Sequence, residues 1–377
     1  MVLTPIRVRG RRWAPGTRNR GSSRHPRRVR AEEQRPRPRE PKQEASKKQP
    51  SLSSLERLPT EILERIAEES LNLSLPLTSR GLFLRLRDSD HLKRAHVIAA
   101  FGPTWAAWFG VERRNVQSYH GWQADVRRVE GDPARQSVVL SLPWAKLPDI
   151  LKFYQYWIRH NAWDREYSNL ELPPIDSRLT GVLSYYPRVQ QMFTELEEGP
   201  MTSRLLLDFT DFIFQSGATR TSEDFDAASY CQALSRSAWV SRYVEVHPQT
   251  RIPDALLKGP WDDEMLIRLF WLVRGGASLN GSRDWELTLE GFQNLMACEN
   301  LMLMYPILFI FCALEVFSEQ WPMHLLDEVS CKVHGMVLHN TERLNDRDFA
   351  KFSVLTTDVL RRAYYRRLHP DSVDHDD

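Results

Sequence analysis

The sequence SLERLPTEILERIAEESLNLSLPLTSRGLFLRL, residues 54–86, decides the fold class of this part of the chain. Pro59 suits the first turn of a helix, where a missing amide donor is tolerated, and Glu61 places negative charge near the positive end of the helix dipole. A helix is therefore predicted to begin near Leu58. Its apolar side chains recur at helical spacing and form one stripe over about three turns. The stripe consists of Leu58, Ile62, Leu63 and Ile66.

A second short helix is predicted after Pro76. Its residues at helical spacing are Leu75, Ser79, Leu82 and Leu86. Asn72 and Ser74 can satisfy backbone groups in the preceding turn, and Gly81 weakens the helix by about 1 kcal/mol relative to alanine. Two short helices joined by a tight connection cannot bury both apolar faces alone, so they need the rest of the chain or a partner.

The same residues resemble an F-box, the short helical module that docks a substrate receptor onto a ubiquitin ligase. LPTEIL at residues 58–63 matches the Leu-Pro and the helix that open F-boxes, and LPLTSR at residues 75–80 matches their later apolar-x-Ser-basic element. The interval from Ile66 to Ser79 is a few residues shorter than usual, and Leu82 stands where an aromatic residue is common. This shortened form is similar to a variant of fungal F-box proteins.

The resemblance implies a non-catalytic substrate receptor of an SCF-type cullin-RING ubiquitin ligase. Residues 51–101 would form the F-box-like module that binds the Skp-type adaptor, and residues 102–377 a helical body that binds an unknown protein substrate. The residues expected to bind the adaptor are Leu58, Pro59, Ile62, Leu63, Ile66, Leu75, Pro76, Leu77 and Leu82. The alternative is that the two helices belong to an ordinary helical core, in a protein-interaction scaffold that acts without a ligase.

Residues 1–50 differ from the rest of the chain in charge. They hold 16 of the 51 Lys and Arg residues and 4 of the 49 Asp and Glu residues, so this tail has a net charge of +12 and the remaining chain −10. The tail is rich in proline and has almost no periodic apolar residues, so it is predicted to be disordered. Arg27, Arg28 and Arg30 could serve in nuclear import or contact nucleic acid, which gives a third functional class. A solvated basic tail is the simpler interpretation, and nucleic acid is not expected among the partners.

The rest of the chain is predicted to be all-helical, with one short strand at residues 137–142 (SVVLSL). The expected helices cover residues 88–101, 146–163, 178–196, 205–215, 224–244 and 349–368. Tyr154, Trp157 and Trp163 could form a recognition surface, because aromatic residues anchor interfaces. Packing in the core is the expectation for these three residues, with Asn161 on the same buried side.

The best-signalled helix follows Pro260. Asp262, Asp263 and Glu264 supply negative charge in its first turn, and it is expected to end at Gly275-Gly276. Its apolar face is Leu266, Leu269, Phe270 and Val273. The sequence LVRGGASLN at its end resembles the end of an ankyrin repeat, although repetition at about 33 residues is not found elsewhere. A degenerate helical-repeat body and a general α-helical body both stay open.

The most apolar run, LMLMYPILFIFCAL at residues 301–314, is expected to be buried core. It is shorter than the about 20 residues that a bilayer span needs, and no secretory signal is visible. The four cysteines are widely spaced and fit free thiols in a reducing compartment: Cys231, Cys298, Cys312 and Cys331. The chain is therefore expected to act inside the cell, in the nucleus, the cytoplasm or both, without a membrane partner.

Motifs of catalytic chemistry are not found. The sequence contains no GxSxG, P-loop, HExxH or Gly-rich turn between a strand and a helix. Asp262, Asp263 and Glu264 are better explained as helix N-terminal charge than as paired catalytic carboxylates. We therefore expect no catalytic residue, no cofactor and no metal site.

Overall fold

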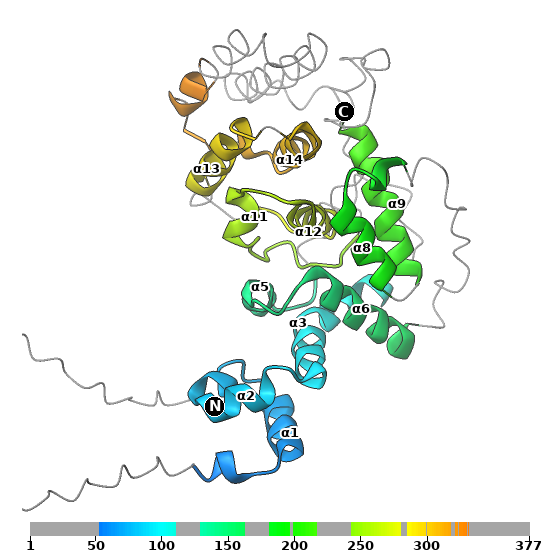
Figure 1. Cartoon of the computed structure of the whole chain (residues 1–377), viewed down its shortest axis with the longest axis vertical. Helices are drawn as coiled ribbons and strands as arrows, with labels where there is room; N and C mark the ends of the chain where they lie inside the picture. The colour runs from blue at the N-terminus through cyan, green and yellow to red at the C-terminus, as the bar shows by residue number, and fades with distance from the viewer. Residues whose placement is uncertain are drawn as a thin grey trace, which may run out of the picture. The chain divides into compact units, whose positions relative to one another are not determined.

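The computed structural model describes residues 53–110, 129–162, 181–196, 199–216, 243–279, 285–298, 300–317, 321–322, 324–329 and 331. Every regular element within these ranges is helical, and they contain no strand, which confirms the mainly helical fold class (Figure 1). The predictions for the tail, for the helix at 349–368 and for nearly all of the helix at 224–244 lie outside the described residues.

The first described residues form a small module of short helices. The elements are η1 (Leu55–Arg57), α1 (Thr60–Ser70), η2 (Leu75–Thr78) and α2 (Arg80–Leu86), and α3 (Asp90–Gly110) follows them. α1 begins two residues after the predicted start at Leu58, because Pro59 has an extended backbone and precedes the first helical residue. The predicted turn is confirmed, since the amide of Ser74 donates to Asn72 Oδ1 at 2.9 Å. Ser79 caps α2 by accepting from the amide of Leu82 at 3.1 Å.

The module has a core of its own. α1 and α2 pack against each other, and the start of α3 packs against α1. The buried residues are Leu63, Ala67, Leu82, Leu86 and Leu92, and Leu55, Leu58 and Leu75 pack partly buried around them. The two short helices therefore bury their inner faces against each other and against α3. This agrees with the prediction that they need a further part of the chain, or a partner, to cover their apolar faces.

α3 joins this small core to the main one. Leu92 near its start belongs to the module, whereas Val97, Phe101 and Trp105 further along are fully buried in the main core. Trp105 stacks on Tyr154, with ring centroids 4.2 Å apart. The predicted helix at 88–101 is thus confirmed and extends to Gly110.

The strand predicted at residues 137–142 is wrong, because this segment lies in α5 (Pro133–Ser141). Asp132 caps the helix by accepting from the amide of Arg135 at 3.0 Å, and Pro133 occupies its first position. These start signals and packing against α3 outweigh the strand preference of two adjacent valines.

Three helices cover part of the main core: α6 (Leu147–Asn161), α8 (Pro187–Glu195) and α9 (Pro200–Gln215). On α6, Tyr154 and Trp157 are buried, which confirms their core placement, whereas Asn161 is exposed, contrary to prediction. Trp163 lies outside the described residues. The helix predicted at 178–196 is interrupted before Pro187, which starts α8 as a new helix.

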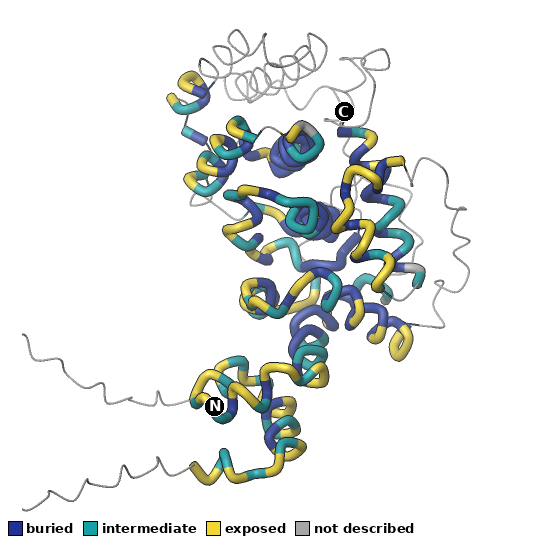
Figure 2. The backbone as a smooth tube through the Cα atoms, viewed as in Figure 1, coloured by how far each residue is buried: buried dark blue, intermediate teal, exposed yellow. Residues whose placement is uncertain are grey.

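The next four helices form two pairs: α11 (Asp254–Lys258) with α12 (Asp263–Arg274), and α13 (Trp285–Met296) with α14 (Leu301–Ala313). α11 packs against α13 and α12 against α14 (Figure 1), so successive pairs stack, as in the helical-repeat alternative. α12 begins three residues after Pro260. It is buried on nearly all sides and not only on the predicted face, because α8, α9, α11 and α14 all contact it (Figure 2).

The apolar run of α14 is core, as predicted. Most of α14 is buried (Figure 2). Ile307, Phe309, Ile310 and Phe311 are fully buried, and Leu308 is almost so. No described helix combines the length and apolarity that a bilayer span requires. The cysteines within the described ranges, Cys298, Cys312 and Cys331, are free thiols.

Ile307→Val is expected to lower the free energy of unfolding by about 0.5–1.5 kcal/mol, because it removes one buried methylene group. The matched control is Ile62→Val, because the Ile62 side chain is 46% exposed. This variant should lose no more than about 0.5 kcal/mol of unfolding free energy. Urea unfolding measures both. Equal losses in the two variants would contradict the burial of α14.

Candidate functional site

The structure divides the nine predicted adaptor-binding residues into three groups. Pro59, Ile62 and Leu77 are exposed, and Leu77 is 73% exposed. Four are partly buried: Leu58, Ile66, Leu75 and Pro76. Leu63 and Leu82 are buried at 0% and 2% exposure in the core of the module, so we correct them from contact residues to core residues. Helical spacing explains the split, because Leu63 and Ala67 form the inner stripe of α1 and Ile62 and Ile66 lie on its flank.

Two exposed apolar residues were missed by the sequence reasoning. Phe83 is 40% and Leu84 51% exposed. The signal lies in RGLFLRL, because this short helix has apolar residues on every side and only Leu82 and Leu86 face the core. Four of the eight large apolar side chains exposed in the described ranges belong to this module: Ile62, Leu77, Phe83 and Leu84. Exposed apolar residues gathered on one small module are typical of an interaction surface.

Arg85 fixes the position of the Leu58-Pro59 corner. Its guanidinium reaches from α2 to the start of α1, where Nη1 donates to Glu56 O at 2.9 Å and Nη2 to Leu58 O at 2.6 Å. Nε and Nη2 also donate to Thr60 Oγ1, at 3.2 and 2.9 Å. Only a planar fork of donors can satisfy this group of acceptors. The exposed end of α1 is therefore held by hydrogen bonds as well as by apolar packing.

Glu56 adds a second link between η1 and α2. Its carboxylate accepts from Ser79 Oγ at 2.7 Å and from the amide of Ser53 at 2.7 Å. The hydrogen bond from Ser79, followed by those from Ser53, lowers the pKa of the Glu56 carboxyl. Gly81 permits this approach, because a Cβ at that position would lie 2.9 Å from Glu56 Oε1. A glycine that weakens α2 as a helix thus serves the packing of the module.

Arg85→Ala is expected to destabilise the module by about 1–3 kcal/mol, because partly buried carbonyl acceptors lose charged donors. Amide hydrogen exchange in α1 should rise, and Arg85→Lys should restore little of the loss, since one ammonium cannot span these acceptors. The matched control is Arg87→Ala, because Arg87 is exposed and pairs with Asp88 at 3.0 Å. Equal exchange rates in the Arg85 and Arg87 variants would show that the corner holds without Arg85.

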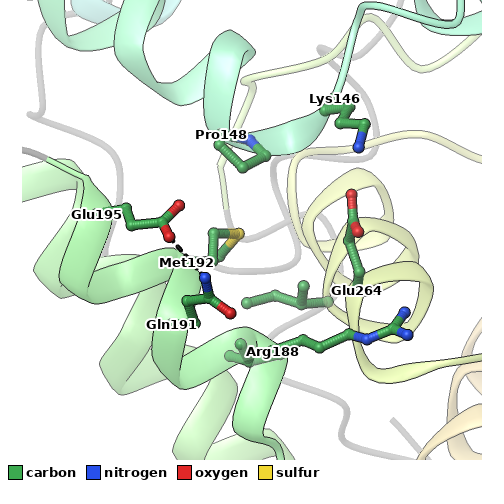
Figure 3. A pocket seen from close by; sticks show the side chains of 9 residues that line it. Lys146, Pro148, Arg188, Gln191, Met192, Glu195 and Glu264 are labelled. Carbon is green, nitrogen blue, oxygen red and sulfur yellow. Dashed lines mark hydrogen bonds between the residues drawn. The ribbon is translucent and has the colours of Figure 1, made fainter.

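A pocket of about 330 Å³ lies where α6, α8 and α12 meet (Figure 3). Its lining residues are Lys146, Pro148, Arg188, Val189, Gln191, Met192, Glu195, Glu264 and Ile267. Lys146 and Pro148 lie on the side formed by α6, opposite Gln191 and Arg188, and Met192 lies between Glu195 and Glu264 (Figure 3). The sequence reasoning did not identify this pocket, because its walls come from three helices far apart in the chain.

Arg188 ties two walls of the pocket together. Its guanidinium pairs with the Asp262 carboxylate, and its backbone amide donates to Asp263 Oδ2 at 2.7 Å. The first turn of α8 is therefore fixed to the first turn of α12. Asp262 also caps α12 by accepting from the amide of Met265 at 2.8 Å, which is the helix N-terminal role that the sequence predicts.

Potential metal ligands are not clustered in the part of the chain that the structure describes. The described residues contain no group of three or more His, Cys, Asp or Glu side chains placed to hold a metal ion. Searches against protein-family models, curated proteins and solved structures found no match for this chain. The arrangement described here offers two surfaces for binding, the exposed apolar residues of the module and the pocket.

Proposed function

We propose that the protein is an F-box-like substrate receptor of an SCF-type ubiquitin ligase. In this proposal the module from η1 to α2 binds the Skp-type adaptor, and the helical body binds a protein substrate. The receptor has no chemistry of its own: the ligase's other subunits transfer ubiquitin, and this chain brings the substrate within their reach. Its action is expected inside the cell, in the nucleus, the cytoplasm or both.

One observation carries the proposal. The two motifs of the resemblance, residues 58–63 and 75–80, lie together on one small module whose inner face is satisfied by its own core. Its outer face still presents Ile62 and Leu77, two of the residues that the resemblance assigns to adaptor binding. Apolar side chains that a folded module leaves in water are available to stabilise a complex.

The direct test mixes the purified full chain with a purified Skp-type adaptor and measures binding by isothermal titration calorimetry. We expect a one-to-one complex with a dissociation constant in the micromolar range or below, and a negative heat-capacity change from apolar burial. Absence of binding at micromolar concentrations would reject the receptor role. The protein would then be an interaction scaffold that acts without a ligase.

The scaffold alternative has its own support. Leu63 and Leu82 complete the core of the module without a partner, as expected for helices that belong to an ordinary helical fold. Co-purification distinguishes the two functions, because a scaffold would be recovered without the adaptor. The third class, a factor that contacts nucleic acid through the basic tail, predicts salt-sensitive binding that is lost when residues 1–50 are deleted.

A further inference from the structure

We infer that the pocket between α6, α8 and α12 binds an arginine side chain from a peptide segment of a partner protein. The inference rests on the proposed function only in naming that partner as the substrate. The pocket itself is independent of the adaptor-binding module, because none of its lining residues lies before Lys146.

The floor of the pocket fits the aliphatic part of a long side chain. Met192 is 7% exposed, and Val189 and Ile267 are fully buried, so the core directly beneath the pocket is apolar and Met192 is the one of these three side chains with surface left for a ligand. Pro148 closes the side formed by α6. Arginine covers apolar surface with its methylene groups while its charged head stays at the rim. The volume of about 330 Å³ lies at the low end of the range for ligand sites, as expected for one side chain and its adjoining backbone.

The rim supplies two carboxylates for the guanidinium. Glu195 and Glu264 project from opposite sides of Met192 (Figure 3). Glu195 is oriented by a hydrogen bond from Gln191 Nε2 at 2.7 Å, which leaves its second oxygen for a ligand. Two carboxylates on opposite sides suit the planar fork of arginine better than the single point charge of lysine.

The lining has as many cations as carboxylates, Lys146 and Arg188, but one of the two cations is already engaged. Arg188 pairs with the Asp262 carboxylate, and Arg268, one turn after Glu264, donates to Leu140 O at 2.7 Å. Of the two lining cations, Lys146 is the one that forms no ion pair within 4 Å in the described part of the chain. Its ammonium would disfavour a second basic residue next to the bound arginine and could donate to a peptide carbonyl. The charges therefore favour one arginine and disfavour a basic run.

The test uses the full chain and fluorescein-labelled Ser-Gly-Leu-Arg-Gly-Ser, with binding followed by fluorescence anisotropy. Matched peptides carry citrulline, lysine or glutamate in place of arginine. We expect the arginine peptide to bind about tenfold more tightly than the citrulline peptide, which has the same shape without the charge. Glu195→Gln and Glu264→Gln should each weaken binding by about fivefold or more. Glu68→Gln, at an exposed position on α1, should leave it unchanged.

Equal affinity of the arginine and citrulline peptides would overturn the inference, as would unchanged affinity in both pocket variants or no binding of the arginine peptide at millimolar concentration. Thermal midpoints equal to that of the unsubstituted protein exclude misfolding. Adaptor binding is measured on the same preparations. A protein that binds the adaptor but not the peptide would overturn this inference alone, and one that binds the peptide but not the adaptor would support the pocket while rejecting the receptor role.

Discussion

Replacing Arg274 by alanine is expected to lower the free energy of unfolding by about 3–5 kcal/mol. The Arg274 side chain is only 1% exposed and lies between two buried carboxylates. Its Nε donates to Asp208 Oδ2 at 2.7 Å, and its Nη1 donates to both oxygens of Glu245, at 3.0 and 3.1 Å. The guanidinium carbon also lies 3.9 Å from the centre of the Tyr243 ring. Truncation would leave two carboxylates in the core without the guanidinium between them.

Arg274 is positively charged in the folded protein, because its two carboxylate partners favour the charged guanidinium. Burial alone would lower the pKa of Arg274, but Glu245 and then Asp208 outweigh it and raise the pKa above its ordinary value. Glu245 also accepts from Trp271 Nε1 at 2.7 Å, and its backbone carbonyl accepts from Trp105 Nε1 at 3.0 Å. The cluster therefore connects α3, α9 and α12, and its loss should loosen all three.

Arg188→Ala is the matched control. Arg188 also faces two carboxylates, those of Asp262 and Asp263, but its side chain is 62% exposed. Solvent screens exposed pairs, so this control should cost at most about 1 kcal/mol. Unfolding both variants in guanidinium chloride measures their losses of stability, and the difference separates the effect of burial from the effect of charge pairing. A loss below about 1 kcal/mol for Arg274→Ala would mean that water reaches the cluster and that its carboxylates need no buried partner.

Such a cluster cannot be predicted from one sequence. Asp208, Glu245 and Arg274 are separated by 29 or more residues along the chain, and nothing local distinguishes them from surface charges. Local signals were informative where the chain itself supplies the partner: Asp262 was predicted as helix N-terminal charge and caps α12. At residues 137–142 the local signal was misleading. The two valines suggested a strand, whereas the helix signal, the cap at Asp132, lies outside that segment.

The adaptor-binding residues show a related limit. Periodicity predicted an apolar stripe on the first helix, but a period cannot say which edge of the stripe faces the protein's own core. The structure turns Leu63 inward and leaves Ile62 outside, a difference of one residue that decides which substitution tests binding. Leu77 is 73% exposed because η2 holds it on a tight turn after Pro76.

Ile62→Asp combined with Leu77→Asp is expected to abolish binding to a Skp-type adaptor while the protein stays folded. The two positions are 46% and 73% exposed, so aspartate at each remains hydrated in the free protein. In a complex each would place an unpaired charge in an apolar contact. The control is Val138→Asp, because Val138 is an aliphatic residue on α5 with 47% exposure. Calorimetric titration should give wild-type affinity for this control.

The size of the contact argues that more than these two residues take part. Fully burying an apolar side chain contributes about 1.5–3 kcal/mol, whereas association costs an estimated 4–15 kcal/mol. Ile62 and Leu77 together would contribute about 3–6 kcal/mol, which reaches at most the low end of that cost and leaves too little for micromolar affinity, about −8.2 kcal/mol. Phe83 and Leu84 are therefore the next residues expected to weaken adaptor binding when changed to aspartate. Leu63→Asp should instead unfold the module, because Leu63 is fully buried. If the Ile62 and Leu77 double variant binds the adaptor as the wild type does, this surface is not the docking site; if it unfolds like Leu63→Asp, these side chains serve the protein's own packing and the scaffold function is favoured.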